Sequence, residues 1–186
     1  MNNVMNVEAY VPKDGDKYFF DANIWMFFCC PIIGDYRKEI ISKYSGFLKK
    51  ILSNDTTIYI SSLTISEVIN AWLRLDFNIL KHKKTVGKNY KQHYRKSEYY
   101  QNTVKEIKAV FDSQLLKIST PIDDRATEIS ISDVLSGLDK SDFNDCYYHQ
   151  LAKLDDLIIV TNDGDFAALD TGISILTANQ KLLATA

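Results

Sequence analysis

The fold of this 186-residue chain is indicated by the stretch Leu157–Asp163, which reads LIIVTND. Four apolar residues form a short strand, and a carboxylate follows where the strand ends. The same order occurs twice earlier, because Asp21 follows the apolar run Tyr18–Phe20 and Glu67 comes soon after Ile58–Ile60. Strands that alternate with helices predict a parallel sheet, and such sheets place their sites outside the carboxyl ends of the strands.

A fourth carboxylate, Asp145, lies in the helical segment that leads into the last of these strands. We therefore expect Asp21, Glu67, Asp145 and Asp163 to converge at one edge of the sheet. Two carboxylates about 4 Å apart repel by roughly 4 kcal/mol at an effective dielectric constant of 20. A cluster of this kind persists only if protons or a divalent cation neutralise it. The sequence therefore predicts a Mg²⁺ or Mn²⁺ site.

Composition and charge limit the class of protein. The length predicts one domain, and the content of 46% apolar and 25% charged residues is typical of globular proteins. A net charge of −2 means that any binding of nucleic acid must depend on local patches. Three cysteines, two of them adjacent, give neither a disulfide framework nor zinc-type spacing. We expect a cytoplasmic protein without a signal peptide, and the apolar stretch Tyr18–Ile33 is too short to cross a membrane.

Hydrophobic periodicity predicts an alternation of strands and helices. The expected strands are 17–21, 56–60, 115–118, 157–160 and 173–176. The expected helices are 23–29, 35–52, 64–80, 97–113, 123–136, 141–154 and a short helix within 162–169. A polar N-terminal arm, residues 1–16, precedes a single domain over residues 17–186. The pattern is that of an α/β chain with a basic helical insert at about 81–108.

The segment 81–96 interrupts the helical pattern, since it contains seven Lys/Arg residues and no acid. Two tyrosines are interleaved with these basic residues. The segment could be a phosphate-binding patch whose tyrosines stack on unpaired bases, or it could be an ordinary solvated helix surface. On the first interpretation, the candidate RNA-binding residues are Lys83, Lys84, Lys88, Lys91, Tyr90 and Tyr94.

Two of the acids and two polar neighbours also have structural interpretations. Asp21 could be a helix N-cap, and Glu67 completes the capping-box pattern TISE over residues 64–67. Asn23 and Thr161 could cap the ends of elements, or they could orient a carboxylate or a metal-bound water. The residues alone leave both interpretations open.

The acids late in the chain have structural interpretations as well. Asp142 and Asp145 fall in the first turns of a helix, where the helix dipole favours acids. Asp163 and Asp165 could be turn residues around Gly164. The occurrence of all these acids beside strand ends favours a common site over a set of independent structural roles.

The ordered set of motifs resembles the PIN domain, a family that includes the VapC-like toxin ribonucleases of bacterial toxin–antitoxin modules. The resemblance extends from residue 17 to about residue 176. It is carried by Asp21-Ala22-Asn23, by Glu67 early in a helix, by SDFND over 141–145 and by TNDGDF over 161–166. The separation of 18 residues between Asp145 and Asp163 is similar to that between the third and fourth acids of the family.

The resemblance implies a three-layer α/β/α sandwich with a central, mostly parallel sheet. It also implies a Mg²⁺- or Mn²⁺-dependent endoribonuclease with RNA as substrate, a small antitoxin as partner and a possible homodimer. By the match, the metal-binding and catalytic acids are Asp21, Glu67, Asp145 and Asp163, and the secondary residues are Asp142, Asp165, Asn23 and Thr161. The chain is longer than compact members, with the surplus in the N-terminal arm and the insert, a region where such toxins have a helical pair that grips the antitoxin.

The residue types agree with metal-assisted hydrolysis, because Mg²⁺ prefers oxygen ligands and can activate a water for attack on phosphorus. The glycine-flanked serine elbow of Ser/His/Asp enzymes is absent from the sequence. His149, one turn beyond Asp145, either is structural or faces the site. The alternatives are a nuclease of RNA processing or DNA repair, a receiver-like signalling domain, or a catalytically inactive binding domain. An Asp-x-Asp phosphatase fits poorly, because Asn23 stands two residues after Asp21.

Overall fold

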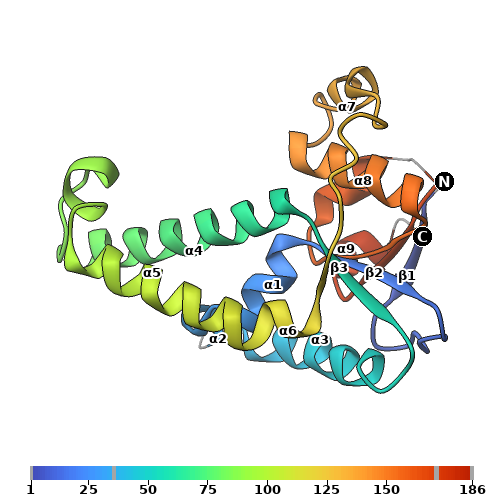
Figure 1. Cartoon of the computed structure of the whole chain (residues 1–186), viewed down its shortest axis with the longest axis horizontal. Coiled ribbons are helices and arrows are strands. Elements are labelled where there is room, and N and C mark those ends of the chain that lie inside the picture. The colour runs from blue at the N-terminus through green and yellow to red at the C-terminus, as the bar shows by residue number, and fades with distance from the viewer. Residues whose placement is uncertain (1, 35–36, 170–171, 185–186) are drawn as a thin grey trace.

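The structure is a computed structural model that describes residues 2–34, 37–169 and 172–184. Its centre is a sheet in which the described strands run in the order β1-β6-β5-β2-β3-β4 (Figure 1). The strands are β1 (Asn3–Asn6), β2 (Lys17–Phe20), β3 (Thr57–Ile60), β4 (Thr120–Pro121), β5 (Ile158–Val160) and β6 (Ser174–Thr177). All the pairs between these strands are parallel, as the sequence predicts.

The helices follow the strands in the expected alternation. They are α1 (Ala22–Cys29), α2 (Pro31–Gly34), α3 (Lys38–Ile51), α4 (Ser62–His82), α5 (Glu98–Val110), α6 (Leu116–Ile118), α7 (Ile131–Ser136), α8 (Phe143–Asp155) and α9 (Gln180–Leu183). Short π-helical turns occur at Tyr90–Tyr94 and Phe111–Leu115, and a 3₁₀ turn at Gly164–Ala168. Within the described ranges, none of these helices is both long enough and apolar enough to cross a membrane.

The side chains of the central strand β2 alternate between the two faces of the sheet. Tyr18 and Phe20 are buried in a core shared with α1, α3 and α4. Phe19 points into a second core that contains Tyr148 of α8 and Leu182 of α9. Helices therefore cover both faces of the sheet, which confirms the predicted three-layer α/β/α sandwich.

The register of the sheet determines where the strand ends lie. Phe20 is paired with Val160, and Phe19 is paired with Tyr59. Because the strands are parallel, Asp21 and Thr161, the first residues after β2 and β5, leave the sheet side by side. This edge is where the sequence predicts the site.

The N-terminal segment is more than an arm, because its residues Asn3–Asn6 form β1 and pair with β6 at the edge of the sheet. This part of the predicted N-terminal arm was assigned wrongly. Edge pairing uses backbone groups, which every non-proline residue carries, and the four residues of β1 are too few to show an apolar alternation in the sequence. The segment after β1 is tied to α3 by an ion pair between Glu8 and Lys43 at 3.2 Å.

Two elements in the middle of the chain also differ from the prediction. The predicted strand 115–118 is helical, and the short strand follows it at Thr120–Pro121. The predicted helix 123–136 is reduced to Ile131–Ser136, and Arg125 before it has a left-handed φ of 54° that interrupts helical geometry. The predicted helix 35–52 begins with two residues, 35 and 36, that lie outside the described ranges.

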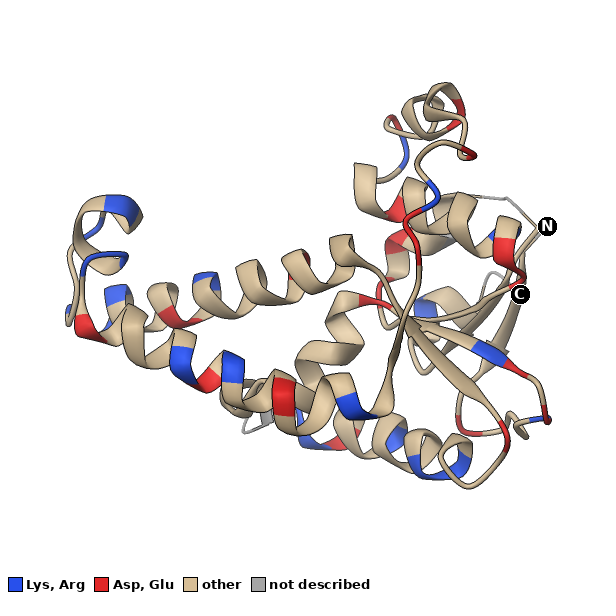
Figure 2. Ribbon diagram, in the orientation of Figure 1, with Lys and Arg blue, Asp and Glu red and all other residues tan. Residues whose placement is uncertain are grey.

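Helices α4 and α5 form a long hairpin, the arm (residues 62–110), that projects from the sandwich (Figure 1). The 21 residues of α4 give it a length of about 32 Å. The turn between the helices, the arm tip (residues 81–96), carries several of the Lys and Arg residues shown in Figure 2. The predicted basic insert is therefore the outer part of a helical hairpin.

Packing of aromatic rings holds the two helices of the arm together. The Tyr94 side chain is completely buried, and its hydroxyl donates to Asp76 Oδ2 at 2.6 Å. Thr103 of α5 donates to the same oxygen at 2.9 Å. The Tyr94 ring lies 5.5 Å from the Phe77 ring and 5.2 Å from the Tyr90 ring, measured between centroids. A ring in this position cannot stack on bases, so the prediction of base stacking by Tyr94 is wrong.

Replacing Tyr94 with Phe tests this packing. The change removes one of two side-chain donors to the half-buried Asp76 carboxylate, and we expect a loss of about 1–2 kcal/mol in the free energy of unfolding. We also expect faster hydrogen exchange of amides in residues 81–96. Urea denaturation and hydrogen exchange measure the two effects. The control is Tyr99→Phe, since Tyr99 is 46% exposed, and equal effects of the two substitutions would contradict the assigned role of Asp76.

Candidate functional site

The four predicted acids come from four different parts of the chain. Asp21 joins β2 to α1, and Asp163 joins β5 to the following 3₁₀ turn. Glu67 lies in the second turn of α4, and Asp145 lies in the first turn of α8. Ser61 caps α4 by accepting from the backbone N–H of Thr64 at 3.2 Å. The capping-box interpretation of Glu67 is therefore wrong, because α4 begins earlier than the pattern TISE implies.

Asp21 is held by polar residues at the ends of β2 and β5. Its side chain is 4% exposed, and the Thr161 hydroxyl donates to its Oδ2 at 2.7 Å. The Asn23 amide donates to the same oxygen and, at 3.1 Å, to Thr161 Oγ1. Asp21 occupies the N-cap position of α1 without a side-chain capping bond. In this structure Asn23 and Thr161 thus orient the Asp21 carboxylate.

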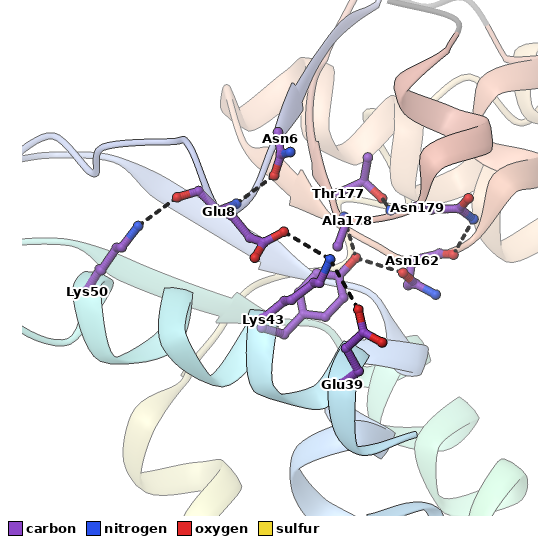
Figure 3. Close-up of polar contacts among 10 residues, drawn as sticks. Asn6, Glu8, Glu39, Lys43, Lys50, Asn162, Thr177, Ala178 and Asn179 are labelled. Carbon is purple, nitrogen blue, oxygen red and sulfur yellow. Dashed lines mark hydrogen bonds and ion pairs between the residues drawn. The ribbon is translucent and has the colours of Figure 1, made fainter. Parts of the chain in front are cut away.

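A second layer of hydrogen bonds fixes the turn after β5. The backbone N–H of Asn162 donates to Asn23 Oδ1 at 3.1 Å, and that of Asp163 donates to Thr161 Oγ1 at 3.0 Å. Asn179 donates through Nδ2 to the carbonyl oxygen of Asn162 at 2.8 Å (Figure 3). The buried Tyr44 hydroxyl donates to the carbonyl oxygen of Thr161 at 2.9 Å. These contacts set the position of Asp163 relative to Asp21.

Helix α8 and the residue that precedes its N-cap supply hydrogen-bond donors to Glu67 and Asp145. Asn144 Nδ2 and the Tyr148 hydroxyl both donate to Glu67 Oε2, each at 3.0 Å. Ser141 donates to Asp145 Oδ2 at 2.6 Å. The sequence pattern did not indicate these three donors. Asn144 and Tyr148 stand one helical turn apart, and this spacing is a usable signal that both lie on one face of α8.

The four carboxylates form one electrostatic unit. Burial raises the pKa of Asp21 to about 8; the hydrogen bond from Thr161 opposes this rise, while Asp145 and Glu67 add to it. Burial likewise raises the pKa of Asp145 to about 7, with a further increase from Asp163 and Glu67. The pKa of Glu67 is also raised, first by burial and then by neighbouring acids that include Asp163. The site therefore favours either protons or a cation.

The carboxylate side chains are suitable ligands for a divalent metal ion, although they do not surround a binding position for one. Within the described part of the chain, no group of three or more His, Cys, Asp or Glu side chains has an arrangement that could hold a metal ion. Mg²⁺ and Mn²⁺ prefer carboxylate oxygens, and a cation would relieve the burial and repulsion that raise these pKa values. The residue types thus suit such an ion, while coordination at about 2.1 Å requires closer approach.

A groove with a volume of about 890 Å³ opens beside the acids. At one end it is lined by Asn23, Glu67 and Asp163. Its apolar walls come from α1, α2 and the inner side of α4. They comprise Ala22, Met26, Phe27, Ile32, Ile33, Ala71, Leu75 and Ile79. Arg37, which no sequence motif indicated, also lines the groove.

The remaining predicted residues lie at the margin of the site or away from it. Asp142 is exposed and caps α8 by accepting from the backbone N–H of Asp145 at 3.0 Å. Asp165 is exposed, and its N–H donates to Asp163 Oδ1 at 3.0 Å, as expected of a turn. His149 is buried and stacks on Phe166, with 5.1 Å between ring centroids, and burial lowers its pKa to about 4. His149 is therefore a packing residue.

The candidate RNA-binding residues are not close to the acids. Lys83 follows Glu67 by 16 residues along α4, which corresponds to about 24 Å. All four lysines are exposed, whereas Tyr90 is partly buried and its ring is covered by the Arg74 guanidinium, 4.5 Å from the ring centroid. The arm tip is thus a separate surface, reached along the arm.

The chain is similar to known proteins in both its sequence and its structure. The PIN domain family profile matches residues 18–172. No curated protein matches the sequence. The crystal structure of VapBC2 from Rickettsia felis, bound to a DNA fragment from their promoter, has a TM-score of 0.51 and 18% identity, and covers 88% of this chain and 99% of that one. FitAB bound to a DNA fragment gives a TM-score of 0.48 and 16% identity, with coverage of 86% and 94%.

Replacing Asp21 with Asn tests the electrostatic strain at the site in the absence of metal. Because the pKa of Asp21 is raised from 3.8 to about 8, the folded protein keeps a proton that the unfolded chain releases. The stability that this retained proton contributes is therefore fully present below about pH 4, and it is lost as the pH rises towards 8. At pH 8 we expect the free energy of unfolding of the Asn variant to be on the order of 2–4 kcal/mol higher than that of the parent.

Urea denaturation in EDTA at pH 4 and at pH 8 measures this difference, and the pH 4 experiment is the internal control. Added Mg²⁺ should stabilise the parent by mass action and should have less effect on the variant. A variant that is less stable than the parent at pH 8, or a parent whose stability does not change between the two pH values, would contradict the assignment.

Proposed function

The chain belongs to the PIN domain family, and we propose that it is a Mg²⁺- or Mn²⁺-dependent endoribonuclease. The observation that supports this most strongly is the convergence of four carboxylates from four elements, two of them with pKa values raised to about 8 and about 7. PIN domains are generally nucleases that use divalent metal ions. A site that favours a cation beside an open groove suits the hydrolysis of a phosphodiester.

In this proposal Asp21, Glu67, Asp145 and Asp163 hold the metal ion. When bound, the ion would lower the pKa of a water and stabilise negative charge on the phosphate. The protein's own contribution is to position the oxygens. Thr161 and Asn23 orient Asp21, and Ser141 orients Asp145. Two residues of α8, Asn144 and Tyr148, orient Glu67.

Burial of the acids decreases towards the groove, which suits entry of substrate from that side. Asp21 is buried, Glu67 and Asp145 are partly buried, and Asp163 is exposed. Glu67 and Asp163 line the groove, whereas Asp21 lies behind them. RNA would therefore meet the outer acids first, and Asp21 would act from beneath.

We further propose that a small antitoxin protein is the physiological partner, as the family resemblance implies. The apolar walls of the groove fit the apolar face of a partner helix. Met26 and Phe27 of α1 line this groove together with Leu75 and Ile79 of α4. A helix bound there would lie beside Glu67 and Asp163, and it would exclude RNA from the acids.

Cleavage of RNA by the purified protein tests the proposed activity. We expect cleavage with Mg²⁺ or Mn²⁺ and none in excess EDTA. Asp21→Asn, Glu67→Gln, Asp145→Asn and Asp163→Asn should each lower the rate by more than the roughly 10–100-fold loss that follows removal of an outer partner of a metal ligand. Circular dichroism checks that each variant is folded. Cleavage that persists unchanged in EDTA would refute metal dependence.

The two acids of α8 provide a matched pair. Asp142 caps the helix, and Asn is an equally good N-cap, so Asp142→Asn should keep the fold and most of the activity. Asp145→Asn should abolish activity, because it removes a proposed metal ligand. Rates on the same RNA measure both. Inactivation by Asp142→Asn with activity retained in Asp145→Asn would mean that the assignment is wrong by one helical turn.

A further inference from the structure

The arm tip concentrates the positive charge of the molecule. Its seven Lys/Arg residues, which are all exposed, are accompanied by no acid. The remaining 170 residues carry 15 Lys/Arg and all 24 Asp/Glu, so the rest of the molecule is strongly acidic. Figure 2 shows basic residues at the far end of the hairpin, away from the sheet. Two regions of opposite charge therefore lie at the two ends of α4.

The tip is a built structure that holds its lysines outward. The Tyr94 and Asp76 contact joins it to α4. Asn89 caps the π-helical turn by accepting from the backbone N–H of Gln92 at 2.9 Å, and its own N–H donates to His93 Nδ1 at 3.1 Å. A Cβ atom at Gly87 would lie 2.5 Å from His93 Nδ1, so a larger residue there would displace the His93 ring. The lysines are thus presented on a fixed support.

The groove beside the acids extends along α4 towards the arm tip and ends at Ile79. The groove is lined by Glu67, Ala71, Leu75 and Ile79, which stand one turn apart along α4. Ile79 is one turn before Lys83. The rise along the α4 axis from Glu67 to Lys83 is about 24 Å, which is the least distance that a bound strand must cover. At about 3.4 Å per nucleotide for a helically stacked strand, this distance corresponds to roughly seven nucleotides.

We propose that the arm tip binds the phosphates of the RNA that is cleaved at the acids, and that it thereby selects RNA reaching at least about seven nucleotides beyond the cleaved bond. The proposal rests on the proposed ribonuclease activity. RNA fits the tip better than an acidic protein does, because the centres of protein interfaces are depleted of lysine and enriched in aromatic residues. The tip exposes lysines, whereas Tyr94 is buried and Tyr90 is covered by Arg74.

The first experiment measures binding without cleavage, in the Asp21→Asn background. The tip variant carries Lys83→Gln, Lys84→Gln, Lys88→Gln and Lys91→Gln. The control variant carries Lys13→Gln, Lys49→Gln, Lys117→Gln and Lys153→Gln, which remove the same charge from exposed sites elsewhere. Fluorescence anisotropy reports the affinity for a single-stranded RNA of about 20 nucleotides, which is long enough to reach the tip.

Each phosphate contact contributes about −0.7 to the log–log slope of affinity against salt. With four lysines in contact, an increase from 50 to 200 mM salt should lower the affinity of the unmodified tip about 50-fold more than that of the tip variant. The control variant should behave like the unmodified tip. Equal salt slopes for all three proteins would overturn the proposal.

The second experiment compares cleavage of two RNAs that share one cleavage site, one of about 20 nucleotides and one of about six, too short to reach the tip. The parent should cleave the longer RNA with a KM at least tenfold lower, and the tip variant should lose this preference. Both proteins should cleave the short RNA equally, since the acids are unchanged. A parent without length preference would overturn the proposal. Failure of the parent to cleave either RNA would refute the ribonuclease activity, while the binding experiment would still decide the role of the tip.

Discussion

The buried Asp21 carboxylate is the constraint on which the rest of the site depends. It stands at the end of a central strand and is 4% exposed, so its negative charge is stable only with hydrogen bonds and a cation. The hydroxyl of Thr161 and the amide of Asn23 supply the hydrogen bonds. Their own positions depend on Tyr44, Asn162 and the parallel register of β2 and β5. Sheet pairing and carboxylate geometry are therefore coupled, and a shift of the register would displace both.

Helix α8 connects the remaining acids into one unit. It carries Asp145 and the two donors to Glu67, so an acid from α4 is oriented by residues that follow it by 77 and 81 positions in the chain. Such an arrangement costs stability, because burial and mutual repulsion raise the pKa values of three carboxylates. In the proposed function a bound cation would relieve this repulsion, in agreement with the general trade-off between stability and activity. Hydrogen bonds fix the orientation of these carboxylates, but they do not neutralise the negative charge.

The arm leads from the acids to a second surface, the arm tip. A single helix, α4, carries Glu67 near its beginning and leads to the exposed lysines of the arm tip at its end. The contacts of Asp76 with Tyr94 and Thr103 hold the two helices of the arm in register. The groove along α4 is apolar, which suits a protein partner, whereas the arm tip is basic, which suits phosphates. Both surfaces therefore share one rigid element, and occupation of the groove would affect access to the acids.

The sequence by itself determined the parallel α/β fold, the long helices and the order of the acids, because apolar period and strand-end carboxylates are local features. The strand β1, the helical course of residues 115–118 and the shortened α7 escaped prediction, since backbone pairing at an edge and left-handed turns leave little trace in apolar period. Only the tertiary structure decided that Tyr94 is buried and that Asn144 and Tyr148 hold Glu67. Periodicity indicates which face of a helix is buried, but a contact between residues far apart in the chain depends on how the elements pack.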